Sequence, residues 1–144
     1  MAESTAGQAT TPKQTLAPFA EVFRATTAGT TDVNIWNIPA KTLITDVFVV
    51  CVTAGVGNTT AYAAVGDEDD EDGFIAGFDP TSAAATCIGD DPTERGDYLY
   101  DSTKKALCGK YYSATKTMEV VLENATNVTT NPVFDVFVMG YRYD

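Results

Sequence analysis

The sequence contains no histidine, and this absence excludes several classes of enzyme. Histidine is the commonest general base near neutral pH and the commonest metal-ligating side chain in proteins. A Ser-His-Asp or Cys-His catalytic arrangement is therefore impossible in this chain. A Gly-rich phosphate loop and a nucleotide-binding fingerprint are also lacking. We therefore expect a protein that is not an enzyme, with no catalytic residue and no cofactor.

Basic residues are scarce as well. Nine Lys and Arg stand against 20 Asp and Glu, which gives a net charge of -11. Phosphate binding depends on a cationic surface, so we expect no nucleic-acid partner. No apolar run approaches the length of a membrane span, and the first 30 residues lack the basic region and apolar core of a signal peptide. We therefore expect no membrane partner.

The three cysteines fit neither a zinc pattern nor a disulfide framework. Cys51 lies in an apolar segment, where we expect it to behave as a small buried hydrophobic residue. Cys87 and Cys108 lie in or near predicted loops. Free thiols are the first expectation for these two, and a disulfide between them is the alternative.

Two stretches are apolar on both faces of an extended strand. In residues 38–54 the density of β-branched and aromatic residues favours a strand. Alternation places Val47, Val49 and Cys51 on one face, and Ile44, Phe48, Val50 and Val52 on the other. In residues 133–143, Phe134, Val136 and Val138 point one way, and Phe137, Met139, Tyr141 and Tyr143 point the other.

Such strands need cover on both sides. A neighbouring subunit is the first expectation, and loops of the same chain are the alternative. The candidates for the oligomer interface are Val47, Val49, Phe137, Met139 and Tyr141, although alternation alone does not tell which face belongs to the core.

The rest of the chain predicts seven to nine strands separated by turns, without a long helix. Further strands are expected near residues 19–24, 32–38, 62–65, 97–101, 110–114 and 117–124, and Asp79-Pro80 predicts a short helical turn over 81–85. The predicted fold is an all-β antiparallel sandwich over residues 19–144, jelly-roll-like or immunoglobulin-like. Residues 1–18 are polar and predict either a disordered tail or an extended arm that orders on a partner.

Six consecutive acidic residues, 67–72, form the only candidate binding site for a metal ion. Aligned as a calcium loop, the candidate ligands are Glu68, Asp70, Asp72 and Asp79. The match is imperfect, because Glu stands at the first position and Asp at the last. A solvated loop is the leading expectation, and calcium binding and docking of basic residues from a partner are the alternatives.

The order of these features resembles the small jelly-roll head decoration (cement) proteins of tailed bacteriophages. The resemblance rests on the polar arm, the IPAKT turn before a Val-rich strand, GDEDDEDGFI, YYSATKTMEVVL and the closing VFDVFVMGYRY. It implies a homotrimer, made in the host cytoplasm, that sits on the outer surface of the virion and clamps subunits of the major capsid protein. Contact with the capsid is then expected from Thr10, Thr11, Pro12, Lys13, Leu16 and Phe19. An 18-residue arm spans up to about 60 Å when extended.

A ligand- or receptor-binding sandwich of a tail, fibre or cell surface is the alternative function. Tyr98, Tyr100, Tyr111 and Tyr112 would then offer stacking platforms for sugars, whereas ordinary cross-strand packing explains them equally simply.

Overall fold

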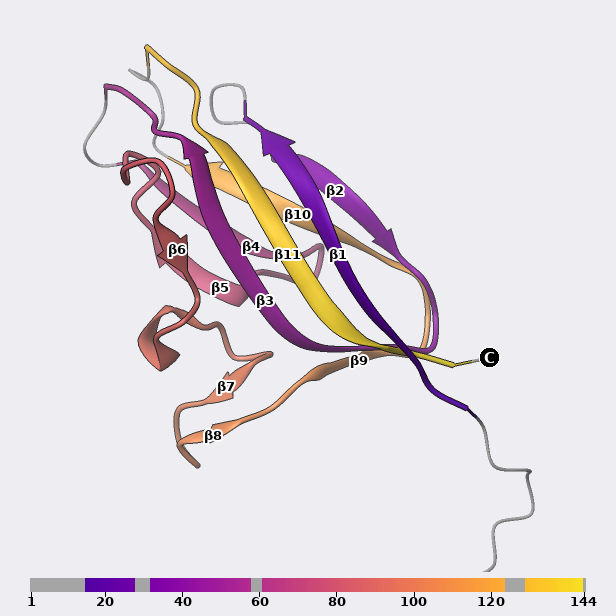
Figure 1. Ribbon diagram of the computed structural model, residues 1–144. Helices are drawn as coiled ribbons and strands as arrows, with labels where there is room; N and C mark the ends of the chain where they lie inside the picture. The colour runs from indigo at the N-terminus through magenta and orange to yellow at the C-terminus, as the bar shows by residue number, and fades with distance from the viewer. Residues whose placement is uncertain (1–14, 28–31, 58–60, 124–128, 144) are drawn as a thin grey trace, which may run out of the picture.

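A computed structural model describes residues 15–27, 32–57, 61–123 and 129–143, and the statements below refer to these residues. They contain no α-helix, and their strands pair in antiparallel sheets (Figure 1). The predicted all-β class and antiparallel sandwich are therefore confirmed. Most of the predicted arm, residues 1–14, lies outside the described residues.

The large sheet contains five strands. Its order is β1 (Ala17–Thr26), β11 (Val133–Arg142), β3 (Thr42–Thr53) and β6 (Cys87–Ile88), and β9 (Lys110–Tyr112) also pairs with β3. The register runs without interruption along all ten residues of β1 against β11. Because β1 begins at Ala17, the sheet starts two residues before the predicted boundary at 19.

The small sheet faces it. Its order is β2 (Val33–Ile38), β10 (Lys116–Glu123), β4 (Tyr62–Asp67) and β5 (Asp70–Phe78). A separate ribbon pairs β7 (Tyr100–Asp101) with β8 (Ala106–Leu107), after a short 3₁₀ helix, η1 (Pro92–Glu94). The first four strands alternate between the two main sheets. This order is compatible with the predicted jelly-roll, which stays a prediction.

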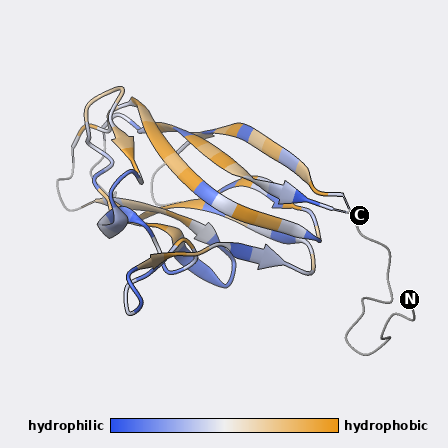
Figure 2. Ribbon diagram, turned by 60° about the horizontal axis from the view of Figure 1, so that its bottom comes forward, coloured by the Kyte–Doolittle hydropathy of each residue, from blue (hydrophilic) through white to orange (hydrophobic). Residues whose placement is uncertain are grey.

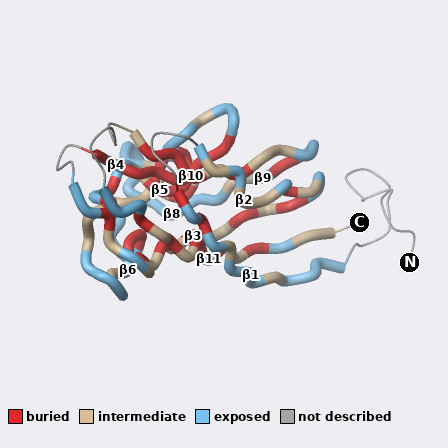
Figure 3. Tube along the Cα trace, turned by 90° about the horizontal axis from the view of Figure 1, so that it is seen from above, coloured by how far each residue is buried: buried red, intermediate tan, exposed pale blue. Residues whose placement is uncertain are grey.

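The core lies between the two main sheets (Figure 3). From β11, Phe134, Val136 and Val138 are fully buried, as their alternation predicts. Met118, Val120 and Leu122 of β10 fill the space from the opposite side. At the edge where β1 meets β2, Phe19 and Phe23 pack on Trp36, with ring centroids 5.6 and 5.3 Å apart.

Strand β3 corrects part of the prediction. Val47, Val49 and Cys51 share the core face, but Ile44 is also fully buried and does not join Phe48 on the outer face. The cause is a bulge, because Asp46 pairs with Met139 and Ile44 with Gly140, which leaves one extra residue in β3. An extra residue reverses the alternation beyond it. Since Val47 and Val49 have no exposed surface, they are core residues and not interface residues.

Three smaller predictions are also resolved. Residues 81–85 form no helix, and the short helical turn follows the second Asp-Pro pair, Asp91-Pro92. The strand expected at 97–101 is reduced to the two residues of β7. All three cysteines are free, with Cys51 buried and the other two exposed.

Candidate functional site: two unlike outer faces

The acidic run forms a tight hairpin and not a long loop. Asp67 ends β4, Asp70 begins β5, and the two are paired across the turn residues Glu68 and Asp69. The Asp67 carboxylate accepts the backbone N–H groups of Asp69 and Asp70 at 2.9 and 3.0 Å. Aspartate commonly stabilises a turn in this way, by bonding to the backbone two residues on.

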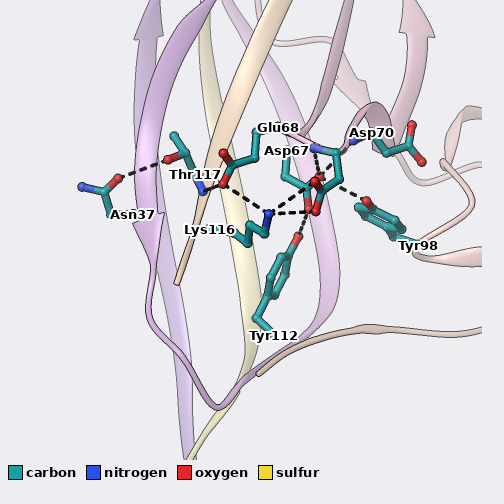
Figure 4. A network of polar contacts seen from close by, with 9 residues as sticks. Asn37, Asp67, Glu68, Asp70, Tyr98, Tyr112, Lys116 and Thr117 are labelled. Atoms are coloured by element: carbon teal, nitrogen blue, oxygen red, sulfur yellow. Dashed lines mark hydrogen bonds and ion pairs between the residues drawn. The ribbon is translucent and has the colours of Figure 1, made fainter. Parts of the chain in front are cut away.

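Asp67 is fully buried and is the centre of a polar network (Figure 4). Tyr98 donates its hydroxyl to one carboxylate oxygen at 3.1 Å, and Tyr112 of β9 donates to the other. A buried carboxylate is tolerated where hydrogen bonds satisfy it, and this one accepts four. Burial first, and then Asp67, raise the pKa of both tyrosine hydroxyls, because a phenolate there would be desolvated and repelled.

A lysine side chain lies beside the turn of the hairpin. The Lys116 ammonium lies 3.7 Å from Glu68 and 3.1 Å from Asp69, so it neutralises part of the turn. Asp70 points elsewhere, and the pKa of its carboxyl is raised by burial and by neighbouring Asp72. Because the run turns back on itself, Asp67 is buried while the five carboxylates that follow lie around one groove.

The predicted calcium ligands do not come together as one loop. Asp79 follows the far end of β5, about 25 Å along the strand from the hairpin turn at about 3.3 Å per residue. Its carboxylate instead accepts the amide and hydroxyl of Thr81, at 2.8 and 2.6 Å. The alignment that paired Asp79 with Glu68, Asp70 and Asp72 is therefore wrong, since a strand replaces the assumed loop.

The outer face of the small sheet carries a different acidic group. Asp32, Glu71 and Glu119 place carboxylate oxygens within 4.8 Å of one another. The pKa of Glu119 is raised, first by partial burial and then by repulsion from Asp32 and Glu71. Beside them, an open groove of about 420 Å³ is lined mainly by residues 68–72, together with Tyr62, Ala64 and Val121. This side of the molecule is strongly acidic.

The outer face of the large sheet has the opposite character. Cross-strand registers place its side chains in rows over β1, β11 and β3. The rows are Val22–Phe137–Phe48, Ala20–Met139–Asp46 and Pro18–Tyr141–Leu43. Val22 is 53% exposed, Tyr141 40% and Phe137 39%. Figure 2 shows hydrophobic residues along the long strands. We call these nine residues the large-sheet outer face.

A shallow apolar groove of about 270 Å³ lies within this face. Its lining residues are Ala20, Glu21, Val22, Phe48, Phe137 and Met139. The prediction that β3 and β11 both carry apolar residues on their second side is confirmed. On β11, Phe137 and Tyr141 are exposed, whereas Phe48 of β3 is half-buried. Of the five predicted interface residues, the structure brings Phe137, Met139 and Tyr141 together on this face.

The charged residues that border the face are paired within the chain. Arg24 of β1 holds Asp135 of β11 through two hydrogen bonds, at 2.8 and 2.9 Å. This pairing lowers the pKa of the Asp135 carboxyl. At the other border, Arg95 contacts Asp46 at 2.8 Å and lies over the Phe48 ring, 5.4 Å from its centroid. The border is therefore electrically neutral.

The remaining predicted site residues have other surroundings. Thr10, Thr11, Pro12 and Lys13 lie outside the described residues. Leu16 is 52% exposed, whereas Phe19 packs on Trp36 and lies beneath the Arg142 guanidinium at 4.7 Å.

The four tyrosines proposed as sugar platforms do not form one surface. Tyr98 and Tyr112 point into the Asp67 network, and Tyr98 also lies beneath the Lys110 ammonium at 4.0 Å. Tyr111 stacks on Tyr143, with ring centroids 6.2 Å apart. Tyr100 belongs to the small β7–β8 ribbon. A shared stacking platform is therefore not built from these four side chains.

Sequence reasoning missed the Asp67 network and the Arg95–Asp46 pair. Both join residues that are far apart in the chain, and no local motif marks them. Only the position of Asp67, one glycine after the apolar residues Ala63, Ala64 and Val65, indicates that this carboxylate differs from the five that follow.

Together, the two sheets define an all-β sandwich with one acidic and one apolar outer face. No protein-family model matches the sequence. No curated protein matches it either. In the described residues, no helix has the length and apolar character needed to cross a membrane.

Two solved structures contain similar chains. One is the acidic stable capsid of the Helicobacter pylori bacteriophage KHP30, with a TM-score of 0.56 and 12% identity over 90% of this chain and 93% of that one. The other is the capsid asymmetric unit of cyanophage Pam1, with a TM-score of 0.50 and 12% identity over 98% and 97%. At this identity the likeness shows a shared fold. Both matches run nearly end to end, so the matched chains are close to this one in length.

Proposed function

We propose that this protein is a structural component of a bacteriophage virion. It binds the outer surface of the capsid as a homotrimer and stabilises the contacts between subunits of the major capsid protein. It is not an enzyme and needs no cofactor. Residues 1–18 and nearby loops supply the contact with the capsid.

The observation that carries this proposal is the end-to-end likeness to chains of two phage capsid structures. The likeness covers almost the whole of this sequence and of each matched chain. The order of sequence features, from the polar arm to the closing strand, independently resembles phage decoration proteins. Fold likeness alone does not fix function, so this step is an inference by analogy.

The distribution of charge supports the outer surface of the capsid. A net charge of -11 and an acidic outer face on the small sheet repel packaged DNA. A protein on the inner wall would meet that repulsion, whereas one on the outside avoids it. The apolar face of the large sheet supports assembly with other protein subunits.

Binding to capsids tests the proposal. Capsids of the encoding phage, assembled without this protein, are mixed with the full chain and sedimented. We expect the chain to sediment with the capsids and to saturate at a multiple of three copies per binding position. A chain that lacks residues 1–14 keeps every described residue, so it should fold normally and bind the capsid more weakly.

Failure to sediment at any concentration would refute the proposed function. Binding of the free protein to a defined glycan on an array, without binding to capsids, would favour the receptor-binding alternative. Capsids of an unrelated phage serve as the control for nonspecific adsorption.

A further inference from the structure

We propose that the large-sheet outer face is the surface on which a second copy of this chain docks, with Phe137 at its centre. The proposed function supplies the number of copies, and the location of the contact rests on the structure itself. The inference therefore identifies the surface by which the proposed trimer assembles.

The first argument is the extent of the apolar surface. Val22, Phe137 and Phe48 form a continuous row across three strands, and Met139 and Tyr141 extend it along β11. This is the side of the sheet that turns away from the core. Among the described residues, only Arg95 lies across a ring of this row, that of Phe48. When such a face associates with another surface, each Å² of apolar area removed from water contributes about 25 cal/mol of favourable free energy.

The second argument concerns charge, and it selects a copy of this chain as the occupant. Two copies that each carry -11 repel one another over most of their surfaces. The large-sheet outer face is different, because the charged residues in and around it form neutral pairs, which are Arg24–Asp135, Arg95–Asp46 and Arg142–Glu21. All of the net charge is therefore carried by other residues. A copy can approach this face without meeting a layer of like charge.

A basic partner, in contrast, would be attracted to the small sheet. The acidic hairpin and the cluster of Asp32, Glu71 and Glu119 lie on that side. The large-sheet outer face offers a basic partner no unpaired carboxylate among its described residues. The two faces therefore suit different occupants, and self-association belongs to the apolar one.

The face is also suited to a closed trimer. In a three-fold ring each copy contacts two neighbours through two different patches. A flat face turned toward the symmetry axis is divided between those neighbours, with its β1 side meeting one and its β3 side the other. Phe137 lies on β11, the middle of these three strands, so three copies of its ring would surround the axis.

Absolute mass in solution tests this surface without any capsid. Light scattering on a sizing column is used for the full chain, for Phe137→Glu and for Leu107→Glu. Leu107 is the matched control, since it is 71% exposed on β8, away from the large-sheet outer face. We expect oligomers for the full chain and for Leu107→Glu. We expect at least about tenfold weaker association for Phe137→Glu, because a carboxylate would be buried.

Salt provides a second readout. Raising NaCl from about 0.05 to 0.5 M shortens the Debye length and screens the repulsion between acidic copies. Apolar self-association should therefore strengthen with salt, whereas docking of the acidic face on a basic surface would weaken. Oxidation of Met139 provides a third readout in the unmodified chain. The thioether should react more slowly in the oligomer than in diluted monomer, because the contact covers it.

The inference is overturned if the full chain is a monomer at every concentration and salt level, or if Phe137→Glu associates as tightly as the full chain. Circular dichroism must show that Phe137→Glu is folded. If that variant is unfolded, protection of Met139 in the full chain decides the question, and equal reactivity in oligomer and monomer overturns the inference. If the oligomer is weakened by Phe137→Glu but does not bind capsids, the proposed function is refuted and this inference is not. A capsid-binding oligomer insensitive to Phe137→Glu would refute this inference alone.

Discussion

Removal of one hydroxyl from the Asp67 network tests the account of the acidic hairpin. In Tyr112→Phe, the buried Asp67 carboxylate loses one of its four hydrogen bonds while the ring still fills its place in the core. A hydrogen bond to a charged group contributes about 1.5–3 kcal/mol. We therefore expect a loss of about 2 kcal/mol in the free energy of unfolding.

Urea unfolding, followed by circular dichroism, measures this loss. With a slope of about 2 kcal/mol per M, the midpoint should fall by about 1 M. Tyr111→Phe is the matched control on the neighbouring residue, because its exposed hydroxyl forms a hydrogen bond with the Tyr143 hydroxyl at 2.7 Å and takes no part in the Asp67 network. Its midpoint should move by less than about 0.3 M. All variants are compared at one protein concentration, since oligomers link stability to concentration.

A thermodynamic cycle with Asp67→Asn sharpens the test. The neutral amide removes the charge that strengthens the hydrogen bond, so Tyr112→Phe should cost less than half as much in that background. Equal midpoints for Tyr112→Phe and Tyr111→Phe would refute the reasoning. The hairpin would then not depend on its buried carboxylate.

Three further predictions concern the network and the acidic face. Because the folded state raises the pKa of Tyr98 and Tyr112 above the usual value of about 10, the protonated hydroxyls contribute stability below pH 10 that is lost as pH rises further. Ultraviolet titration should therefore show that some of the seven tyrosines ionise only when the protein unfolds at high pH. Ionisation of all seven in the folded state would contradict this prediction.

Gly73→Ala should lower the melting temperature more than Gly77→Ala. A Cβ at Gly73 would lie 2.4 Å from the Tyr98 ring, whereas a Cβ at Gly77 would lie 3.0 Å from the exposed Tyr62 side chain. Equal melting temperatures would count against this packing. Glu119→Gln should raise stability at pH 7 by up to about 1 kcal/mol. Since burial and nearby carboxylates raise the pKa of Glu119 in the fold, this advantage should shrink as pH falls through that raised pKa. An advantage that is constant with pH would exclude charge repulsion as its cause.

Strand β11 shows how far alternation can predict this fold. Its inward and outward residues follow a strict period of two, so the buried and exposed sets are both read correctly from the sequence. Strand β3 is also rich in Val and contains Phe48, but a bulge reverses its alternation before Asp46. The bulge depends on how Met139 and Gly140 pair across the sheet, and the local sequence of β3 does not contain that information.

Two identical local signals give different structures. Asp79 and Asp91 are each followed by Pro-Thr, and each accepts the amide and hydroxyl of the threonine two residues on. Only the second continues into a 3₁₀ helix. There, the Glu94 side chain accepts the backbone N–H of Gly89 at 2.8 Å and ties the turn to the preceding strand. The Asp-Pro-Thr sequence predicts the turn, and the additional Glu94–Gly89 hydrogen bond accompanies its extension into a 3₁₀ helix.

The acidic run shows why the candidate site was harder to predict. Six carboxylates in sequence favour a solvated loop, because like charges repel. The hairpin forms instead with hydroxyls from Tyr98 and Tyr112, which lie 31 and 45 residues from Asp67. Lys116 is supplied from yet another strand. Long-range partners thus convert a predicted loop into a strand, and composition alone does not identify such partners.

Electron cryomicroscopy of reconstituted capsids tests the central claim most directly. Capsids of the encoding phage, assembled without this protein, are imaged before and after addition of the full chain. The account predicts new density on the outer surface, at three-fold positions, in units of about 46 kDa, three times the chain mass of 15.3 kDa. Saturated capsids without added outer density, or density on the inner wall, would contradict it.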